Sequence, residues 1–179
     1  WIESRRGEML GFWSKVEDGT IPTRVTHNDT KINNILFDKK GGVLCAIDLD
    51  TVMNSTSLND FGDAIRSYAN TGEEDDRDLS RVGMSLDMFR AYTEGYLSQR
   101  AKQLTEPEID NLAFSARYIT YEQVLRFLMD YIDGDTYYKI KYPEHNLVRT
   151  HAQYELLRSM EKQYGTMCDI VRETVAKYR

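Results

Sequence analysis

Three polar residues near the beginning of the chain, Asp29, Asn34 and Asp48, have types and spacings that could support catalysis. Asn34 follows Asp29 by five positions, and Asp48 follows Asp29 by nineteen, directly after the apolar run 43–47. Phosphoryl transfer from ATP needs a group that orients the attacking hydroxyl and accepts its proton, and it needs oxygen ligands for the magnesium ions that bridge the phosphates. The spacing therefore predicts Asp29 as the catalytic base and Asn34 and Asp48 as ligands of Mg²⁺.

Three linked motifs contain these residues. They are His-Asn-Asp-Thr-Lys-Ile-Asn-Asn over 27–34, Ala-Ile-Asp-Leu-Asp-Thr-Val-Met over 46–53 and Asp-Phe-Gly-Asp-Ala-Ile-Arg over 60–66. Together they resemble the catalytic region of the protein-kinase-like superfamily, in the branch of the aminoglycoside phosphotransferases and choline kinases. Within that branch they are most similar to the N-acetylhexosamine 1-kinases, and a weaker match over residues 126–137 extends the resemblance toward the C-terminal half.

The resemblance implies a small-molecule kinase that uses ATP and Mg²⁺ and phosphorylates a sugar, at the anomeric hydroxyl of an N-acetylhexosamine. An alternative in the same class is a kinase of aminoglycosides or of an amino alcohol such as choline, whose cationic substrate would need carboxylates or an aromatic cage. The acidic run 73–78 could attract such a cation, although a run of this kind is ordinarily a solvated loop.

Two further classes are alternatives. Some relatives in this branch are named mucin desulfatases, but sulfatase chemistry needs a nucleophile in Cys/Ser-x-Pro-x-Arg, and the sequences after Cys45 and Cys168 do not match it. The other alternative is a catalytically inactive binding module. The joint presence of Asp29, Asn34 and Asp48 argues against that alternative.

Other residues of the motifs are candidates for supporting roles. Lys31 could neutralise charge on the transferred phosphoryl group, or it could be a solvated loop lysine. The resemblance implies that His27 holds the catalytic loop, and Asp63 resembles the structural aspartate of the family, which hydrogen-bonds that loop. Asp50 could support the metal site or lie in a solvated turn, and the sequence leaves both open.

The tripeptide at residues 60–62, Asp-Phe-Gly, matches the magnesium motif of protein kinases in its letters but not in its position. Asp60 lies 31 residues after Asp29, whereas the resemblance implies a metal carboxylate about twenty residues after the base. Ser57 precedes Asp60 by three positions, which is typical of a helix capping box, and Thr105 precedes Glu108 in a second box of this kind. We therefore predict Asp60 as a capping carboxylate and not as a metal ligand.

Arg126 and Tyr137 are candidates for contacts with the sugar. Arg126 lies among apolar residues of a predicted helix, where a buried guanidinium needs acceptors from a ligand or from a residue such as Asp130. Tyr137 follows Gly-Asp in a predicted loop, so its ring could stack on a sugar. The neighbouring tyrosines could also stack on a sugar, although most tyrosines at helical spacing are expected in the core; they are Tyr118, Tyr121, Tyr131 and Tyr138.

The remaining pattern predicts a mainly helical α+β fold with a small β-hairpin that carries the catalytic and metal loops. The predicted helices cover residues 2–18, 57–70, 86–100, 106–132 and 147–178, and the predicted hairpin joins 35–37 to a buried strand at 43–47. We expect residues 1–179 to form one domain, the C-terminal lobe of a kinase-like enzyme. No Gly-rich loop and no Val-Ala-x-Lys strand precedes residue 27, so we expect the nucleotide lobe to be absent from this chain and the chain alone to be inactive.

Composition limits the kinds of partner that this chain can have. The net charge is −6 and the chain has no basic stripe, which disfavours nucleic acid as a partner. The chain contains no run of 18 apolar residues, so the sequence predicts no membrane span. Cys45 and Cys168 are far apart in the chain, and Cys45 lies in an apolar strand pattern, which suits a reducing compartment. We therefore expect a cytoplasmic protein whose partners are a small sugar and its own missing lobe.

Overall fold

Five α-helices and two short pairs of antiparallel strands form the chain in this computed structural model, which describes residues 1–179. The helices are α1 (Ile2–Glu17), α2 (Ser57–Tyr68), α3 (Leu86–Arg100), α4 (Glu106–Ile132) and α5 (His145–Tyr178). The strands are β1 (Arg24–Thr26), β2 (Ile35–Phe37), β3 (Val43–Ala46) and β4 (Met53–Ser55), and the 3₁₀ turns are η1 (Ile32–Asn34), η2 (Leu49–Thr51) and η3 (Leu79–Arg81). The predicted mainly helical α+β class is confirmed.

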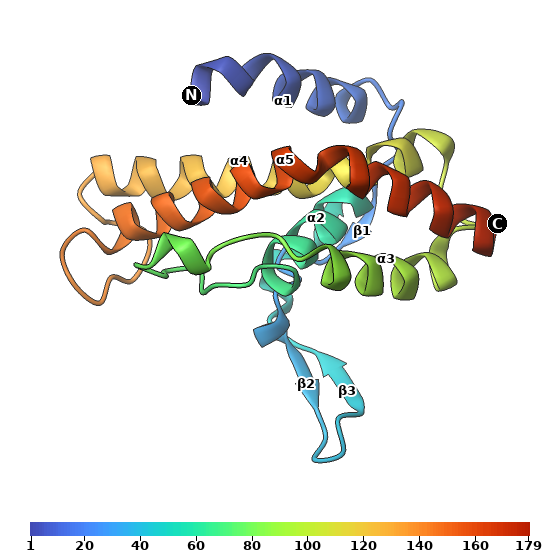
Figure 1. Cartoon of the computed structure of the whole chain (residues 1–179), viewed down its shortest axis with the longest axis horizontal. Coiled ribbons are helices and arrows are strands. Elements are labelled where there is room, and N and C mark those ends of the chain that lie inside the picture. Colours follow the sequence, from blue (N-terminus) through green and yellow to red (C-terminus); the bar gives the residue numbers. More distant parts are fainter.

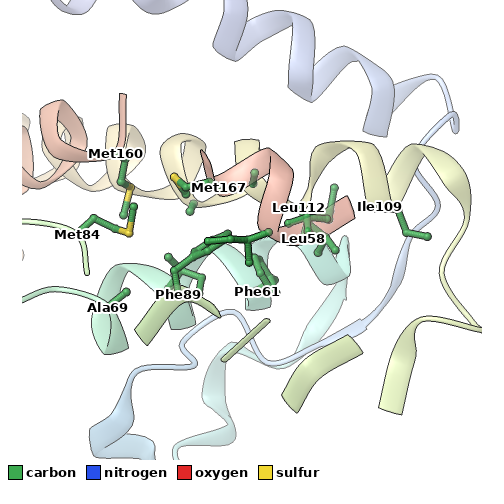
Figure 2. Packing of buried hydrophobic residues seen from close by; sticks show 14 of the residues in the cluster. Leu58, Phe61, Ala69, Met84, Phe89, Ile109, Leu112, Met160 and Met167 are labelled. Atoms are coloured by element: carbon green, nitrogen blue, oxygen red, sulfur yellow. The ribbon is translucent and has the colours of Figure 1, made fainter. Parts of the chain in front are cut away.

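The helices make the body of the molecule. Helices α4 and α5 lie side by side along its length, α2 packs against α4, and α3 packs against α5 (Figure 1). Their apolar faces meet in one cluster that includes Phe61, Phe89, Leu112 and Met167 (Figure 2). Burying each such side chain contributes about 1.5–3 kcal/mol, so this cluster supplies the rigid support for the site. No helix in the structure combines the length and hydrophobicity needed to cross a bilayer.

The N-termini of α4 and α2 give opposite outcomes for the predicted capping boxes. At α4 the prediction is confirmed, because the Thr105 hydroxyl accepts the N–H of Glu108 while the Glu108 carboxylate accepts the N–H of Thr105. At α2 the predicted box is wrong. The N-cap is Thr56, whose hydroxyl accepts the N–H of Leu58, and Ser57 is already the first helical residue.

The Asp-Phe-Gly tripeptide lies within α2, and its last two residues have packing roles. Phe61 is fully buried in the core cluster. Gly62 faces α4 so closely that a Cβ atom built there would lie 2.4 Å from the carbonyl oxygen of Ser115. A glycine is therefore required for α2 to approach α4 at this distance.

Strands β1 and β4 pair next to the helical body and fix the two ends of the candidate catalytic segment. Their register places Arg24 opposite Ser55 and Thr26 opposite Met53. The Arg24 guanidinium binds the fully buried carboxylate of Glu108 in α4 through two hydrogen bonds of 2.7 and 2.8 Å. This bidentate pair holds the strand that leads into residue 27 against the N-terminus of α4.

The β2–β3 hairpin projects away from the helical body (Figure 1). The predicted hairpin is confirmed, and Gly41 adopts a positive φ of 83° in its turn. The prediction that residues 43–47 form a buried strand is wrong, since Val43 and Leu44 are 67% and 63% exposed and Cys45 is exposed as well. The apolar run is a two-stranded ribbon that no other element of the chain covers, so its composition alone does not bury it.

Candidate active site

The segment between β1 and η1, residues 27–31, is held by Asp60 of α2. The Asp60 carboxylate accepts the backbone N–H groups of His27 at 3.0 Å and of Asn28 at 2.7 Å. The predicted role of Asp60 as a capping carboxylate is therefore wrong, because its oxygens are directed at this loop. The sequence could not reveal this, since the spacing from Ser57 fits a capping box equally well.

The backbone of the loop turns sharply at Asn28, which has a positive φ of 62°. An L-residue is strained in this region, and asparagine tolerates it better than most residues. The side-chain amide nitrogen of Asn28 donates to the carbonyl oxygen of Thr51 at 3.0 Å, while the backbone N–H of Asn28 donates to the Asp60 carboxylate. These contacts compensate the strained turn, which positions Asp29 at its end.

Asp29 has one carboxylate oxygen bound and the other free. Its Oδ2 accepts a hydrogen bond of 2.6 Å from the Lys31 ammonium and one of 2.8 Å from the Asn34 amide. The Asn34 amide also donates to the Asp29 carbonyl at 2.9 Å. No group of the chain binds Oδ1, so that oxygen can accept the proton of a substrate hydroxyl that lies within hydrogen-bonding distance of it.

His27 joins the loop to the β2–β3 hairpin. Its Nδ1 accepts the N–H of Asp29 at 3.3 Å, so the proton lies on Nε2, which donates to the carbonyl of Ile47 at 3.0 Å. The His27 carbonyl in turn accepts the Thr51 hydroxyl at 2.6 Å. Both ring nitrogens are thus used in positioning, which is the supporting role implied for this histidine.

Asn34 and Asp48 lie at the base of the same hairpin. The N–H of Ile47 donates to the carbonyl of Asn34 at 2.9 Å, which brings the residue before Asp48 against Asn34. Asn34 is buried and its amide nitrogen is engaged by Asp29, which leaves its amide oxygen as an acceptor. Asp48 is exposed in a left-handed conformation with a φ of 62°.

This donor set fits magnesium better than a metal that needs a full protein cage. The chain has no group of three His, Cys, Asp or Glu side chains arranged to hold a metal. Mg²⁺ commonly keeps several waters and is bound by one or two protein oxygens together with substrate phosphates. One carboxylate of Asp48 and one amide oxygen of Asn34 meet that requirement. Asp50, in η2, is exposed and makes no hydrogen bond within the chain.

An open cleft of about 830 Å³ borders Asp29. Its walls come from the catalytic loop, from α2, from the central turns of α4 and from the segment that follows α4. Asp29, Lys31 and Asp63 line the cleft together with Arg126 and Tyr137. The structure thus brings five of the predicted site residues to one concave surface, while Asn34, His27 and Asp48 do not line it.

The comparison with protein families shows to which family the chain belongs. The model of the phosphotransferase enzyme family, abbreviated APH, matches residues 3–101. This chain belongs to the phosphotransferase family. The matched residues include Asp29, Asn34 and Asp48.

Asp63 of this phosphotransferase contacts the loop only weakly. Its carboxylate accepts the Thr30 hydroxyl at 3.4 Å, whereas Thr30 makes its short bond of 2.7 Å to the carbonyl oxygen of Asp60. The main partner of Asp63 is the buried guanidinium of Arg66 at 2.8 Å, and Arg66 also binds Glu74 at 2.7 Å. The predicted role of holding the loop is carried chiefly by Asp60, one helical turn earlier.

Arg126 differs from its predicted environment. The sequence predicts a buried arginine that needs partners, but Arg126 is exposed on the cleft side of α4 and forms no ion pair. Its guanidinium lies 5.9 Å from the ring centroid of Tyr137 and 5.5 Å from that of Tyr138. Both rings can hold the cation over the cleft by cation–π attraction.

Asp130, which the sequence offers as a partner for Arg126, instead organises the segment after α4. Its carboxylate accepts the backbone N–H groups of Thr136, Tyr137 and Tyr138 at 2.8–3.0 Å and the Asn146 amide at 2.7 Å. Burial acts to raise the pKa of Asp130, but the four hydrogen-bond donors outweigh this effect and hold that pKa below its usual range. Asp130 thereby positions the two tyrosines beside Arg126, a role that no pattern in the sequence indicates.

The acidic run 73–78 is a largely exposed loop, as its composition predicts, but some of its carboxylates have partners within the chain. Asp75 accepts hydrogen bonds from Lys141 at 2.9 Å and from the buried His145 at 2.8 Å, and these bonds lower the pKa of Asp75 to about 2. Glu74 is paired with Arg66. Asp75 therefore joins this loop to the start of α5, and the charges of Asp75 and Glu74 are compensated within the chain.

Proposed function

We propose that this phosphotransferase moves the γ-phosphoryl group of ATP to a hydroxyl of a small neutral sugar, the anomeric hydroxyl of an N-acetylhexosamine. The observation that carries the proposal is the free Oδ1 of Asp29, at a cleft large enough for a monosaccharide, while Lys31 and Asn34 fix the other oxygen. A carboxylate held in this way can accept the hydroxyl proton without first rearranging.

The chain supplies the remaining groups for phosphoryl transfer. Asn34 and Asp48 would hold magnesium, which when bound neutralises charge on the phosphates of ATP. Lys31 keeps a cation beside Asp29, where negative charge would accumulate on the transferred group. His27 and Asp60 hold the backbone on both sides of Asp29 and maintain its direction.

The charge balance of the cleft supports a neutral acceptor. Its lining contains four carboxylates and four basic side chains, namely Asp29, Asp63, Glu74 and Glu122 against Lys31, Arg66, Arg126 and Arg149. A polycationic aminoglycoside or a choline-like cation would need an excess of carboxylates or a closed aromatic cage. The cleft has neither, and its tyrosines can instead cover the apolar face of a sugar ring.

The sulfatase alternative has no support in the cleft. Cys45 is exposed on the hairpin and Cys168 lies in α5, and neither residue lines the cleft around Asp29. No cysteine nucleophile is therefore available to a ligand there. The two free thiols fit the proposed location of the protein in the reducing cytoplasm.

The proposal assigns residues 1–179 to the substrate-binding lobe of the enzyme. The β2–β3 hairpin and its surroundings expose apolar side chains that include Val25, Val43, Leu44 and Leu49. Exposed apolar surface of this extent marks a contact site, and a nucleotide lobe that carries the phosphate-binding lysine would cover it. By itself the chain should bind Mg-ATP weakly, since its own ligands for magnesium are few.

Incubation of the two-lobed protein with Mg-ATP and a panel of acceptors tests the proposed function. The panel contains N-acetylglucosamine, N-acetylgalactosamine, glucose, choline and kanamycin, and release of ADP is the readout. An N-acetylhexosamine should give the highest kcat/KM. Turnover of kanamycin or choline alone would move the protein to the alternative kinase class, and turnover of no acceptor in the panel would refute the proposal.

A further inference from the structure

Glu122 is a cleft residue to which neither the motifs nor the family match assigns a role. It lies in α4, outside the matched residues 3–101, and lines the same cleft as Asp29. The structure shows no hydrogen bond and no ion pair for its carboxylate, although the side chain is half-buried. A carboxylate that is partly removed from water and has no protein partner needs donors from elsewhere.

Arg126 stands one helical turn beyond Glu122 on the same face of α4. Residues four positions apart on a helix are neighbours, and a Glu–Arg pair at this spacing can form an ion pair. Here the two groups remain separate, and the Arg126 guanidinium lies instead against the rings of Tyr137 and Tyr138. Burial raises the pKa of Glu122, and the charge of Arg126 opposes part of that rise, so the two side chains are near but unpaired.

The other carboxylates of the cleft are already satisfied. Asp63 and Glu74 are both bound by Arg66, and one oxygen of Asp29 is bound by Lys31 and Asn34. Glu122 is thus the one cleft carboxylate with both oxygens free of protein donors. A ligand in the cleft can bind it without displacing an internal contact.

The chemistry of the pair defines the group that it can recognise. An ionised carboxylate only accepts hydrogen bonds, and a guanidinium only donates them. A substituent between Glu122 and Arg126 is therefore bound best when it has one donor and one acceptor of its own. A secondary amide has this composition, because its N–H can donate to Glu122 while its carbonyl oxygen accepts from Arg126.

We propose that Glu122 is a specificity-determining residue which, together with Arg126, binds the acylamino substituent of the acceptor sugar. This inference rests on the proposed function, in which the acceptor is an N-acetylhexosamine. The carboxylate of Glu122 accepts the amide N–H, and the sugar ring then lies between this contact and Asp29. A sugar that lacks the substituent leaves both charged groups without partners in the cleft, which is a strong basis for rejecting it.

Glu122→Met tests the assignment, because methionine has a similar length and no hydrogen-bond acceptor of comparable strength. We compare kcat/KM of the two-lobed protein for N-acetylglucosamine, glucose and 2-deoxyglucose. In the variant, kcat/KM for N-acetylglucosamine should fall by about 10- to 100-fold, as for loss of a hydrogen bond to a charged group. The kcat/KM for 2-deoxyglucose, which has no substituent at the position of the acylamino group, should change by less than about threefold.

Two controls separate recognition from a structural role. Glu122→Gln keeps an acceptor oxygen and should restore part of the preference for the acetamido sugar. Glu17→Met makes the same change at an exposed glutamate of α1 outside the cleft and should change nothing. The thermal midpoint of Glu122→Met should not fall below that of the wild type, because the substitution removes an unpaired carboxylate from a half-buried position.

The outcomes distinguish the two proposals. If the wild-type protein uses N-acetylglucosamine and Glu122→Met keeps the same preference over 2-deoxyglucose, the inference about Glu122 is wrong and the proposed function stands. A uniform fall for all three sugars with a lowered thermal midpoint assigns Glu122 a structural role and also overturns the inference. If the wild-type protein phosphorylates none of these sugars, the proposed function fails and the inference fails with it.

Discussion

The side-chain amide of Asn34 donates to Asp29 Oδ2 at 2.8 Å, so the residue proposed as a magnesium ligand also fixes the carboxylate proposed as the base. In the proposed function, Asn34 would thereby couple the metal side of the site to its proton-accepting side. The same amide group uses its nitrogen for Asp29 and leaves its oxygen free for a cation. An aspartate at this position could not perform both tasks, since it has no N–H donor.

The first prediction concerns Asn34→Asp. Two carboxylates within hydrogen-bonding distance repel each other, and one of them is expected to take up a proton, which would remove the free base. Turnover should fall by about 100-fold or more, the usual contribution of a positioned general base. Steady-state kinetics with Mg-ATP and N-acetylglucosamine measure the effect. Asn111→Asp, at an amide of α4 outside the cleft, is the control, and equal activity of the two variants would contradict the coupling.

The second prediction separates Asp48 from Asp60. Asp48→Asn should leave the thermal midpoint nearly unchanged, because Asp48 is exposed and asparagine tolerates its positive φ of 62°, but it should abolish most Mg-dependent turnover. Asp60→Ala should lower the free energy of unfolding by about 1–3 kcal/mol, because the N–H groups of His27 and Asn28 lose their acceptor. Thermal melts and magnesium titrations of both variants check this. A stable and fully active Asp60→Ala variant would show that the loop does not depend on Asp60.

The third prediction concerns Arg126. Its guanidinium is unpaired in the cleft, so Arg126→Ala should raise the KM for the sugar by about 10- to 100-fold while the KM for ATP stays within about twofold. Arg172→Ala, at an exposed arginine of α5, is the matched control. Equal increases in both KM values for Arg126→Ala would remove Arg126 from the sugar site.

The fourth prediction is a pH dependence of stability that comes from Asp75. Hydrogen bonds from Lys141 and His145 lower its pKa to about 2 from an ordinary value of 3.8, so the folded state favours the ionised form. The resulting stabilisation is fully present above the pKa of Asp75 in the unfolded chain, and it is lost as the pH falls from about 4 toward 2. Asp75→Asn should therefore cost about 1 kcal/mol near neutral pH, and the difference from the wild type should shrink below about pH 4.

Urea unfolding at a series of pH values measures this difference. Asp110→Asn is the control, because Asp110 is an exposed carboxylate of α4 with no hydrogen bond. A difference between Asp75→Asn and the wild type that stays constant down to about pH 3 would show that the Asp75 cluster does not stabilise the ionised form.

The sequence predicts the helices and the phosphotransferase family well because both depend on local patterns. The capping box at Thr105 and the hairpin turn at Gly41 follow from the types of a few consecutive residues. The order of Asp29, Asn34 and Asp48 indicates phosphoryl transfer for the same reason, since the chemistry requires those groups at short spacing.

The remaining features depend on contacts between distant segments. Whether Asp60 binds its own helix or a loop 33 positions earlier is decided by how α2 packs against β1. Asp130 and Glu122 belong to the same helix, but one binds the segment after α4 and the other is left unpaired in the cleft. The hairpin has the apolar composition of a buried strand, and only its position outside the helical body shows that it is exposed.

The most direct test of the account is the phosphoryl transfer catalysed by Asp29→Asn, measured as sugar 1-phosphate formed by the two-lobed protein from Mg-ATP and N-acetylglucosamine. Asparagine keeps the shape of the side chain but cannot accept the proton of the hydroxyl, so the account predicts a rate at least about 100-fold below that of the wild type, with an unchanged thermal midpoint. Asp110→Asn should match the wild type in both measurements. An Asp29→Asn variant that forms the sugar phosphate within about threefold of the wild-type rate would contradict the assignment of Asp29 as the base.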